Sequence, residues 1–163
     1  MDVIRSRQSD VQSFYFNVKD LETYWSQTRA YHHTSPISMT YALRESLRML
    51  MEEGLEPRIQ RHARVASSLR AGLQAMGIGL LADENYRLNP LTTAVIPEGI
   101  EDAAVRRTLL TSHNIEIGGG LGELSGKVWR IGLMGESAKD TNVFAVVSAL
   151  EKILYKIYCH VKR

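Results

Sequence analysis

The chain has 163 residues, of which 44% are hydrophobic and 23% charged, with only 4 prolines, a composition that excludes a disordered or low-complexity protein. Its net charge of +2, with basic residues scattered among acids, gives no support for nucleic acid or a membrane surface as partner. No stretch approaches the ~20 apolar residues of a membrane span, and no pair of histidines has metal-site spacing. The single cysteine, Cys159, excludes an internal disulfide framework and fits a reducing compartment, so a cytoplasmic location is expected.

The first half of the chain is predicted to be helical. Residues 1–13 are polar and unpatterned, and they are interpreted as a tail or a truncated connection. A short helix is expected over 20–27, followed by long helices over 36–53 and 57–76. Each long helix begins at a proline, which suits a first turn, and ends before a glycine. The two long helices are expected to pack together.

After residue 77 the pattern changes to strands alternating with helices. The expected strands are 78–81, 92–96, 115–117 and 127–134, and the expected helices are 101–113 and a last one from Lys139. This order predicts an α+β fold, in which helices cover one face of a small, mostly antiparallel sheet. The chain therefore divides into a tail (1–13), a helical segment (14–77), a small α+β domain (78–157) and a final tail (158–163).

One arginine, Arg130, lies in the middle of an apolar strand, in the stretch GKVWRIG at positions 126–132. Because successive side chains of a strand point to opposite faces, Trp129 and Ile131 would share the core face and Arg130 would lie on the other. Gly132 beside it leaves room for a ligand. A guanidinium donates two parallel hydrogen bonds to a carboxylate, so Arg130 is a candidate carboxylate clamp. The spacing alone also fits an ordinary arginine that faces solvent.

Three separated motifs together resemble the C-terminal part of one enzyme family. They are YHHT at 31–34 before a helix that reads YALRE at 41–45, LTTAV at 91–95, and the glycine loop IEIGGGLG at 115–122 with Arg130 behind it. Their order and spacing are similar to those of the class V, fold-type I pyridoxal-phosphate aminotransferases, in the branch of alanine-glyoxylate and serine-pyruvate aminotransferases. The resemblance covers roughly residues 5–155. It implies the end of the large domain followed by the whole small C-terminal domain of such an enzyme.

The resemblance implies roles for three residues. Arg130 would bind the carboxylate of the amino acid or 2-oxo acid, and Tyr31 and Thr34 would hydrogen-bond the phosphate of pyridoxal 5′-phosphate. In this family the tyrosine and threonine reach across a dimer interface into the partner's site, which implies a homodimer. Without the resemblance, Tyr31 would be interpreted as packing under the next helix and Thr34 as its N-cap. His32 and His33 are interpreted as packing or interface residues.

The Schiff-base lysine of the family has no counterpart in this chain. Catalysis with this cofactor needs that lysine and an acid paired with the pyridine nitrogen, and in the family both precede the region matched here. None of the six lysines lies in a comparable context. Lys127, three positions before Arg130, would face the other side of the strand as a solvated end. The chain is therefore expected to contain no catalytic residue, and to be inactive and unable to hold the cofactor by itself.

The leading hypothesis is the C-terminal portion of a transaminase that moves an amino group between an amino acid (alanine or serine) and a 2-oxo acid (glyoxylate or pyruvate). The alternative is a non-catalytic binding or dimerisation module derived from such an enzyme by truncation. A third hypothesis is a small nucleotide- or phosphate-binding α+β domain that uses the glycine loop. The loop does not support it, because a dinucleotide-binding glycine loop leads into a helix, whereas this one leads into a strand. Residues 160–163 do not resemble a peroxisomal signal, so the cytoplasm remains the expected location.

Overall fold

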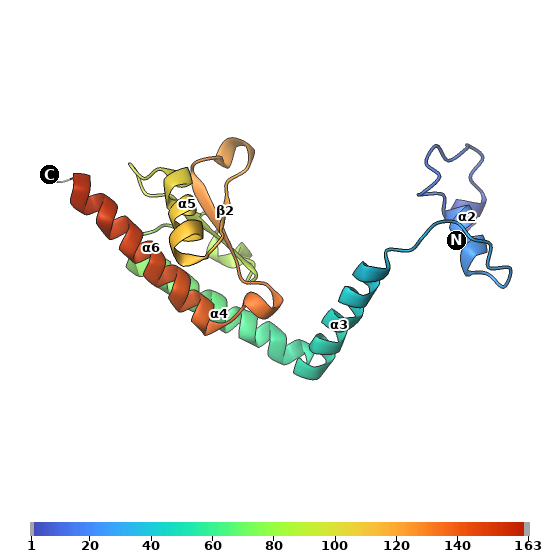
Figure 1. The fold of residues 1–163 in the computed structure, drawn as a ribbon, viewed down its shortest axis with the longest axis horizontal. Coiled ribbons are helices and arrows are strands. Elements are labelled where there is room, and N and C mark those ends of the chain that lie inside the picture. The colour runs from blue at the N-terminus through green and yellow to red at the C-terminus, as the bar shows by residue number, and fades with distance from the viewer. Residues whose placement is uncertain (1, 162–163) are drawn as a thin grey trace. The chain divides into compact units, whose positions relative to one another are not determined.

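The structure is a computed structural model that describes residues 2–161, and the chain divides after Met49 into two compact units (Figure 1). The first unit contains α1 (Asp2–Arg5), α2 (Val18–Trp25) and most of α3 (Ile37–Glu53). Aromatic rings before and after α2 hold this unit together. His32 is buried and stacks on Phe14 with ring centroids 4.1 Å apart, while the centroid of His33 lies 4.7 Å from that of Tyr15. Both histidines are thus packing residues here.

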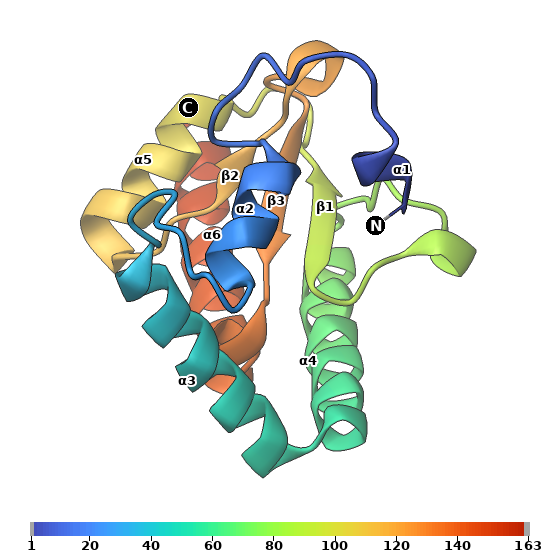
Figure 2. The same ribbon diagram turned by 90° about the vertical axis from the view of Figure 1, so that its right-hand side faces the viewer.

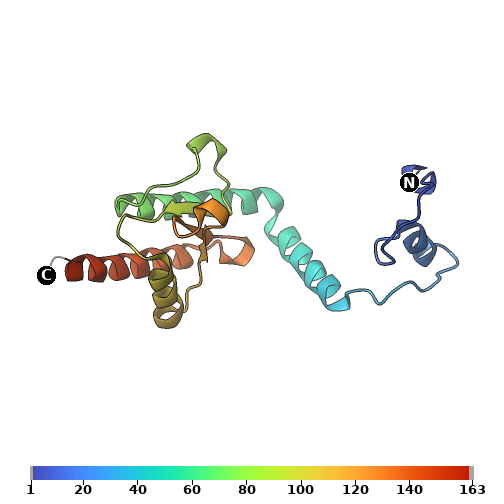
Figure 3. The same ribbon diagram turned by 90° about the horizontal axis from the view of Figure 1, so that it is seen from above.

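The second unit is built from three long helices and a three-stranded sheet. Its elements are α4 (Leu55–Ala75), β1 (Leu91–Val95), α5 (Asp102–His113), β2 (Gly118–Gly119), β3 (Val128–Gly132) and α6 (Asp140–Val161), with the 3₁₀ turns η1 (Glu84–Tyr86), η2 (Gly122–Leu124) and η3 (Gly135–Ser137). The strands pair antiparallel in the order β1-β3-β2. The helices α4 and α6 run side by side behind the sheet, and α5 lies beside α6 (Figures 2 and 3). The predicted α+β fold is confirmed.

The core lies between the sheet and these three helices. Trp129 and Ile131 of the central strand β3 are buried there, as the alternation of the sequence predicts. The helix residues around them include Val65, Leu69 and Leu73 of α4, Val105 and Leu109 of α5, and Val143, Val146 and Leu150 of α6. Burial of one such side chain contributes about 1.5–3 kcal/mol. The pairing register that buries Trp129 and Ile131 is therefore favoured over one that is shifted by a residue.

An ion pair on α5 ties that helix to β3. Arg106 donates from Nε to Oδ1 of Asp102 at 2.8 Å and from Nη2 to Oδ2 at 2.9 Å, and the indole Nε1 of Trp129 donates to Oδ1 at 3.1 Å. The hydrogen bonds from Arg106 are the main reason that the pKa of the Asp102 carboxyl lies below its usual value. The charge of Arg106 and the indole bond act in the same direction, and burial opposes them.

The loop that follows β3 is fastened to α4 by hydrogen bonds. Arg61 donates from Nη1 to the carbonyl oxygens of Gly135 and Ala138, at 3.0 and 2.6 Å. The backbone N–H of Gly135 donates to Nε2 of His62 at 3.0 Å, which leaves Nδ1 of that ring to donate to the carbonyl of Arg58 at 2.7 Å. The end of β3 is therefore held against a long helix rather than left as a free loop.

The glycine loop before β3 has no room for a side chain at Gly120. An ideal Cβ at Gly120 would lie 1.9 Å from the carbonyl oxygen of Leu124 and 3.0 Å from Cγ2 of Val128. This loop covers Val128, which is buried although it lies on the same face of β3 as Arg130.

Two predicted strands differ from the structure. Residues 78–81 form only an isolated bridge, Leu80 to Ala94, because the chain turns away into η1. The predicted strand 115–117 is wrong. Asn114 adopts a left-handed conformation that ends α5, and the N–H of Ile115 donates back to the Leu109 carbonyl at 3.1 Å. The segment serves as a helix cap, and β2 follows it at Gly118–Gly119.

The helices also differ from the predicted division of the chain. An ion pair between Arg5 and Glu22 joins α1, which lies in the segment predicted as a tail, to α2. The helix α6 continues to Val161, into the predicted final tail. The helix α4, which the sequence grouped with the preceding helices, contacts α6 and β1. Most of α3 belongs to the other unit, so its packing against α4 stays a prediction, as do the domain bounds.

We expect Gly120→Ala to lower the free energy of unfolding by about 1–3 kcal/mol or more, because its Cβ would meet a backbone carbonyl. Gly79→Ala is the control, since a Cβ there would lie in ordinary contact, 3.8 Å from Val95. That change should alter stability by less than about 1 kcal/mol. Urea unfolding followed by circular dichroism measures both, and equal losses would contradict the close approach at Gly120.

We expect Asp102→Asn to lower the free energy of unfolding by about 1.5–3 kcal/mol at pH 7, since Asp102 accepts hydrogen bonds from a charged group. A carboxyl whose pKa is lowered by folding contributes stability above its unfolded pKa of about 3.9, and loses it as pH falls through the folded pKa. The difference between wild type and variant should therefore shrink below about pH 4. A difference that stays constant in urea titrations from pH 3 to 7 would refute this.

Candidate functional site

Arg130 lies at the centre of the sheet, on the face opposite the helices. In the antiparallel register its neighbours are Thr93 on β1 and Gly118 on β2. Because directly paired residues share a face, Thr93 and Arg130 point to the same side. The side chain of Arg130 is half-buried. The sequence did not single out Thr93, although it lies in the motif at 91–95; the pairing of β1 with β3 is what identifies it.

The guanidinium of Arg130 is held along the glycine strand β2. Its Nε donates to the carbonyl oxygen of Gly119 at 2.8 Å. An ideal Cβ at Gly118 would lie 3.3 Å from Nη2, so glycine at this position gives the guanidinium its space. With Nε occupied, the edge formed by Nη1 and Nη2 remains for a ligand. That edge can donate two parallel hydrogen bonds to a carboxylate.

Arg130 differs from those arginines of the second unit that form ion pairs, although it shares with Arg70 a hydrogen bond to a backbone carbonyl. Arg58 and Arg61 pair with Glu53, Arg64 pairs with Asp140, and Arg106 pairs with Asp102. Within residues 2–161, no acidic side chain forms an ion pair with Arg130. A half-buried cation without an internal counter-ion is a suitable place for an anionic ligand.

Tyr31 and Thr34 lie in the other unit, in the segment between α2 and α3. Their side-chain oxygens are 2.7 Å apart, and both residues are exposed. The hydroxyl of Thr34 thus contacts Tyr31, and among the described residues no backbone N–H of α3 donates to it as an N-cap would require. Two adjacent neutral hydroxyls fit the oxygens of a phosphate group. Arg130 belongs to the other unit.

The two lysines nearest to Arg130 in the sequence are both exposed. Lys127 is exposed at the start of β3, and Lys139 is exposed and pairs with Glu136 at 3.0 Å. Across residues 2–161 there is no group of three or more His, Cys, Asp or Glu side chains that could bind a metal ion. No helix in the described part of the chain is long and apolar enough to cross a membrane.

Comparison with known proteins places this geometry in a family. No family model matches the chain. It is 44% identical over 146 residues to (S)-ureidoglycine–glyoxylate transaminase of Bacillus subtilis, an alignment that covers 90% of this chain and 35% of that protein. It is 43% identical to alanine–glyoxylate aminotransferase of Callithrix jacchus, covering 93% of this chain and 37% of that protein.

A solved structure agrees with these relatives. The alanine–glyoxylate aminotransferase of a Nostoc species is 46% identical, with a TM-score of 0.86, over 92% of this chain and 40% of that one. The chain therefore spans about two fifths, or slightly less, of the length of the proteins that it matches. These findings confirm the resemblance read from the three motifs. This chain corresponds to the C-terminal part of a class V pyridoxal-phosphate aminotransferase.

Proposed function

We propose that this chain supplies the substrate-carboxylate site of a transaminase that moves an amino group between an amino acid and a 2-oxo acid. The arrangement of Arg130 carries the proposal: Nε is fixed by Gly119, both Nη atoms remain for a ligand, and no acidic side chain within residues 2–161 neutralises the charge. Alanine or serine is the proposed donor. Glyoxylate or pyruvate is the proposed acceptor, and the names of both curated relatives include glyoxylate.

In the complete enzyme, Tyr31 and Thr34 would donate hydrogen bonds to the phosphate of pyridoxal 5′-phosphate. Their adjacent exposed hydroxyls, 2.7 Å apart, support this assignment. When bound, the cofactor supplies the electron sink for amino-group transfer. Arg130 would orient the substrate by holding its carboxylate, which restricts how the reacting carbon can approach.

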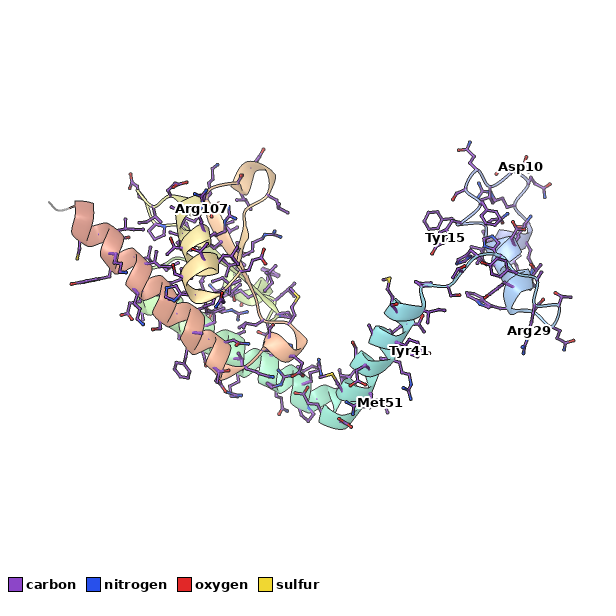
Figure 4. The ribbon with its side chains drawn as sticks, in the orientation of Figure 1. Asp10, Tyr15, Arg29, Tyr41, Met51 and Arg107 are labelled. Atoms are coloured by element: carbon purple, nitrogen blue, oxygen red, sulfur yellow. The ribbon has the colours of Figure 1, made fainter. Side chains whose placement is uncertain are left out.

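We propose that the chain is inactive alone, because the lysine that bonds the cofactor precedes the matched region in the family. A non-catalytic module derived by truncation is not favoured, since the relatives that the chain matches over about 90% of its length are transaminases. A homodimer is proposed because α3 has no buried residue and exposes apolar side chains, among them Tyr41 and Met51 (Figure 4). The cytoplasm is the proposed location, since the single cysteine fits a reducing compartment.

The role of Arg130 can be tested by joining this chain to the N-terminal part of the Bacillus subtilis relative. Arg130→Ala should lower kcat/KM for the amino acid by about tenfold to a hundredfold, because a hydrogen bond to a charged group contributes about 1.5–3 kcal/mol. Arg130→Lys should recover only part of the lost kcat/KM, since lysine keeps the charge but cannot donate two parallel hydrogen bonds to a carboxylate. Reactivity toward an amine without a carboxylate should change little.

Arg107→Ala is the matched control, because Arg107 is an exposed arginine on α5 (Figure 4). It should leave kcat/KM unchanged. If Arg130→Ala reduces the free energy of unfolding and leaves kcat/KM for the amino acid intact, Arg130 is a structural residue and the proposed function is wrong.

The isolated chain should not retain pyridoxal phosphate through dialysis. Lysines on its surface would react only weakly and at several positions, so borohydride followed by mass spectrometry should find no single modified lysine. The joined protein described above is the positive control and should keep a cofactor absorbance band. Stoichiometric trapping on one specific lysine of the isolated chain would show that it contains a cofactor site of its own.

A further inference from the structure

We propose that the Asp102–Arg106 ion pair is a positioning device for Arg130, which it orients through the backbone of Gly119. The two residues act on the substrate site without touching it. This proposal rests on the carboxylate-binding role proposed for Arg130.

The first observation is the contact between the ion pair and Gly119. An ideal Cβ at Gly119 would lie 3.2 Å from Nε of Arg106 and 3.2 Å from Oδ2 of Asp102. The ion pair therefore packs directly against the Cα of this glycine. Any shift of either side chain toward β2 would displace the glycine backbone.

The second observation is that the ion pair is itself fixed from the sheet side. Trp129 is the partner of Gly119 in the antiparallel register, and its indole Nε1 donates to Oδ1 of Asp102 at 3.1 Å. The Asp102 side chain is only 14% exposed. By comparison, the side chain of Asp140, which lies at the start of α6 and pairs with Arg64, is 45% exposed. Its geometry is thus set by a buried indole as well as by a bidentate arginine.

The third observation concerns β2. This strand has only two residues, both glycine, which have more backbone freedom than any other residue. Its own pairing with β3 therefore constrains it weakly. The carbonyl oxygen of Gly119 nevertheless accepts the Nε–H of Arg130 at 2.8 Å. A short glycine strand can hold that carbonyl in one place only if neighbouring side chains support it, and the ion pair supplies that support.

The contact with Gly119 determines which edge of the Arg130 guanidinium is available to a ligand. While the Gly119 carbonyl holds Nε, Arg130 presents its Nη1 and Nη2 edge. If Gly119 moved, the guanidinium could rotate about its long side chain, and the two parallel hydrogen bonds to a carboxylate would lose their alignment. Binding constellations tolerate only about 0.5 Å and 10–20° of such error.

The experiment uses the ¹⁵N-labelled chain and follows the Nε–H signal of Arg130, which Arg130→Lys identifies by its loss. We expect slow hydrogen exchange of this proton in the wild type. Asp102→Asn should raise its exchange rate at least about fivefold, the equivalent of a hydrogen bond of about 1 kcal/mol. Asp102→Glu, which keeps the charge, should restore part of the protection.

Asp140→Asn is the matched control, because Asp140 also begins a helix and pairs with an arginine, Arg64 at 2.7 Å. It should leave the Arg130 signal unchanged. If Asp102→Asn does not fold, Arg106→Lys takes its place, since it keeps the charge and loses the bidentate geometry. A folded variant of either kind whose Arg130 proton exchanges as in the wild type overturns the positioning role.

Titration with acetate separates this result from the proposed function. Acetate should perturb the Arg130 signals in the wild type, and less so in Asp102→Asn. If acetate leaves the wild-type signals unchanged, the carboxylate role of Arg130 is wrong, whatever the exchange rates show. If acetate perturbs wild type and Asp102→Asn equally, Arg130 binds carboxylates and the ion pair does not position it.

Discussion

The antiparallel pairing of β3 with a strand on each side is the constraint on which the second unit depends. It separates Trp129 and Ile131, which are buried under the helices, from Arg130, which faces away from them. A slip of one residue would exchange the two faces and place a guanidinium in the apolar core. The cost of burying an unpaired charge makes that register inaccessible, so the forces that form the core also deliver the arginine to the open face.

The arginines of this unit divide into two groups according to whether they have an acidic partner. Arg58, Arg61 and Arg64 link α4 to neighbouring acids, and Arg61 also fastens the loop after β3. Arg70, Arg87 and Arg130 donate to neutral backbone carbonyls instead. For Arg130 this bond uses Nε alone and leaves the charge without an acidic partner. The charge of Arg130 is therefore available for the carboxylate proposed as its ligand.

The sequence predicted β1, β3, α5 and α6 and the opposite faces of Trp129 and Arg130, because hydrophobic periodicity is a local signal. It missed β2 because two glycines have no pattern, and it misread 115–117 because alternating isoleucines fit a helix cap as well as a strand. The spacing of Asp102 and Arg106 on a predicted helix indicates an ion pair. Its contact with Gly119 could not be read from the sequence, since it depends on how α5 packs against the sheet.

The crowding of the glycine loop also limits how this site can evolve. A side chain at 118 would meet the guanidinium, one at 119 would meet the ion pair, and one at 120 would meet a backbone carbonyl. A substitution at any of these glycines would therefore require a neighbouring group to move, and at Gly120 that group is the backbone. The opposite wall, where Thr93 stands beside Arg130, has no such restriction from a glycine backbone. Under the role proposed for Arg130, divergence in substrate preference should accumulate on β1, while the glycine side keeps its sequence.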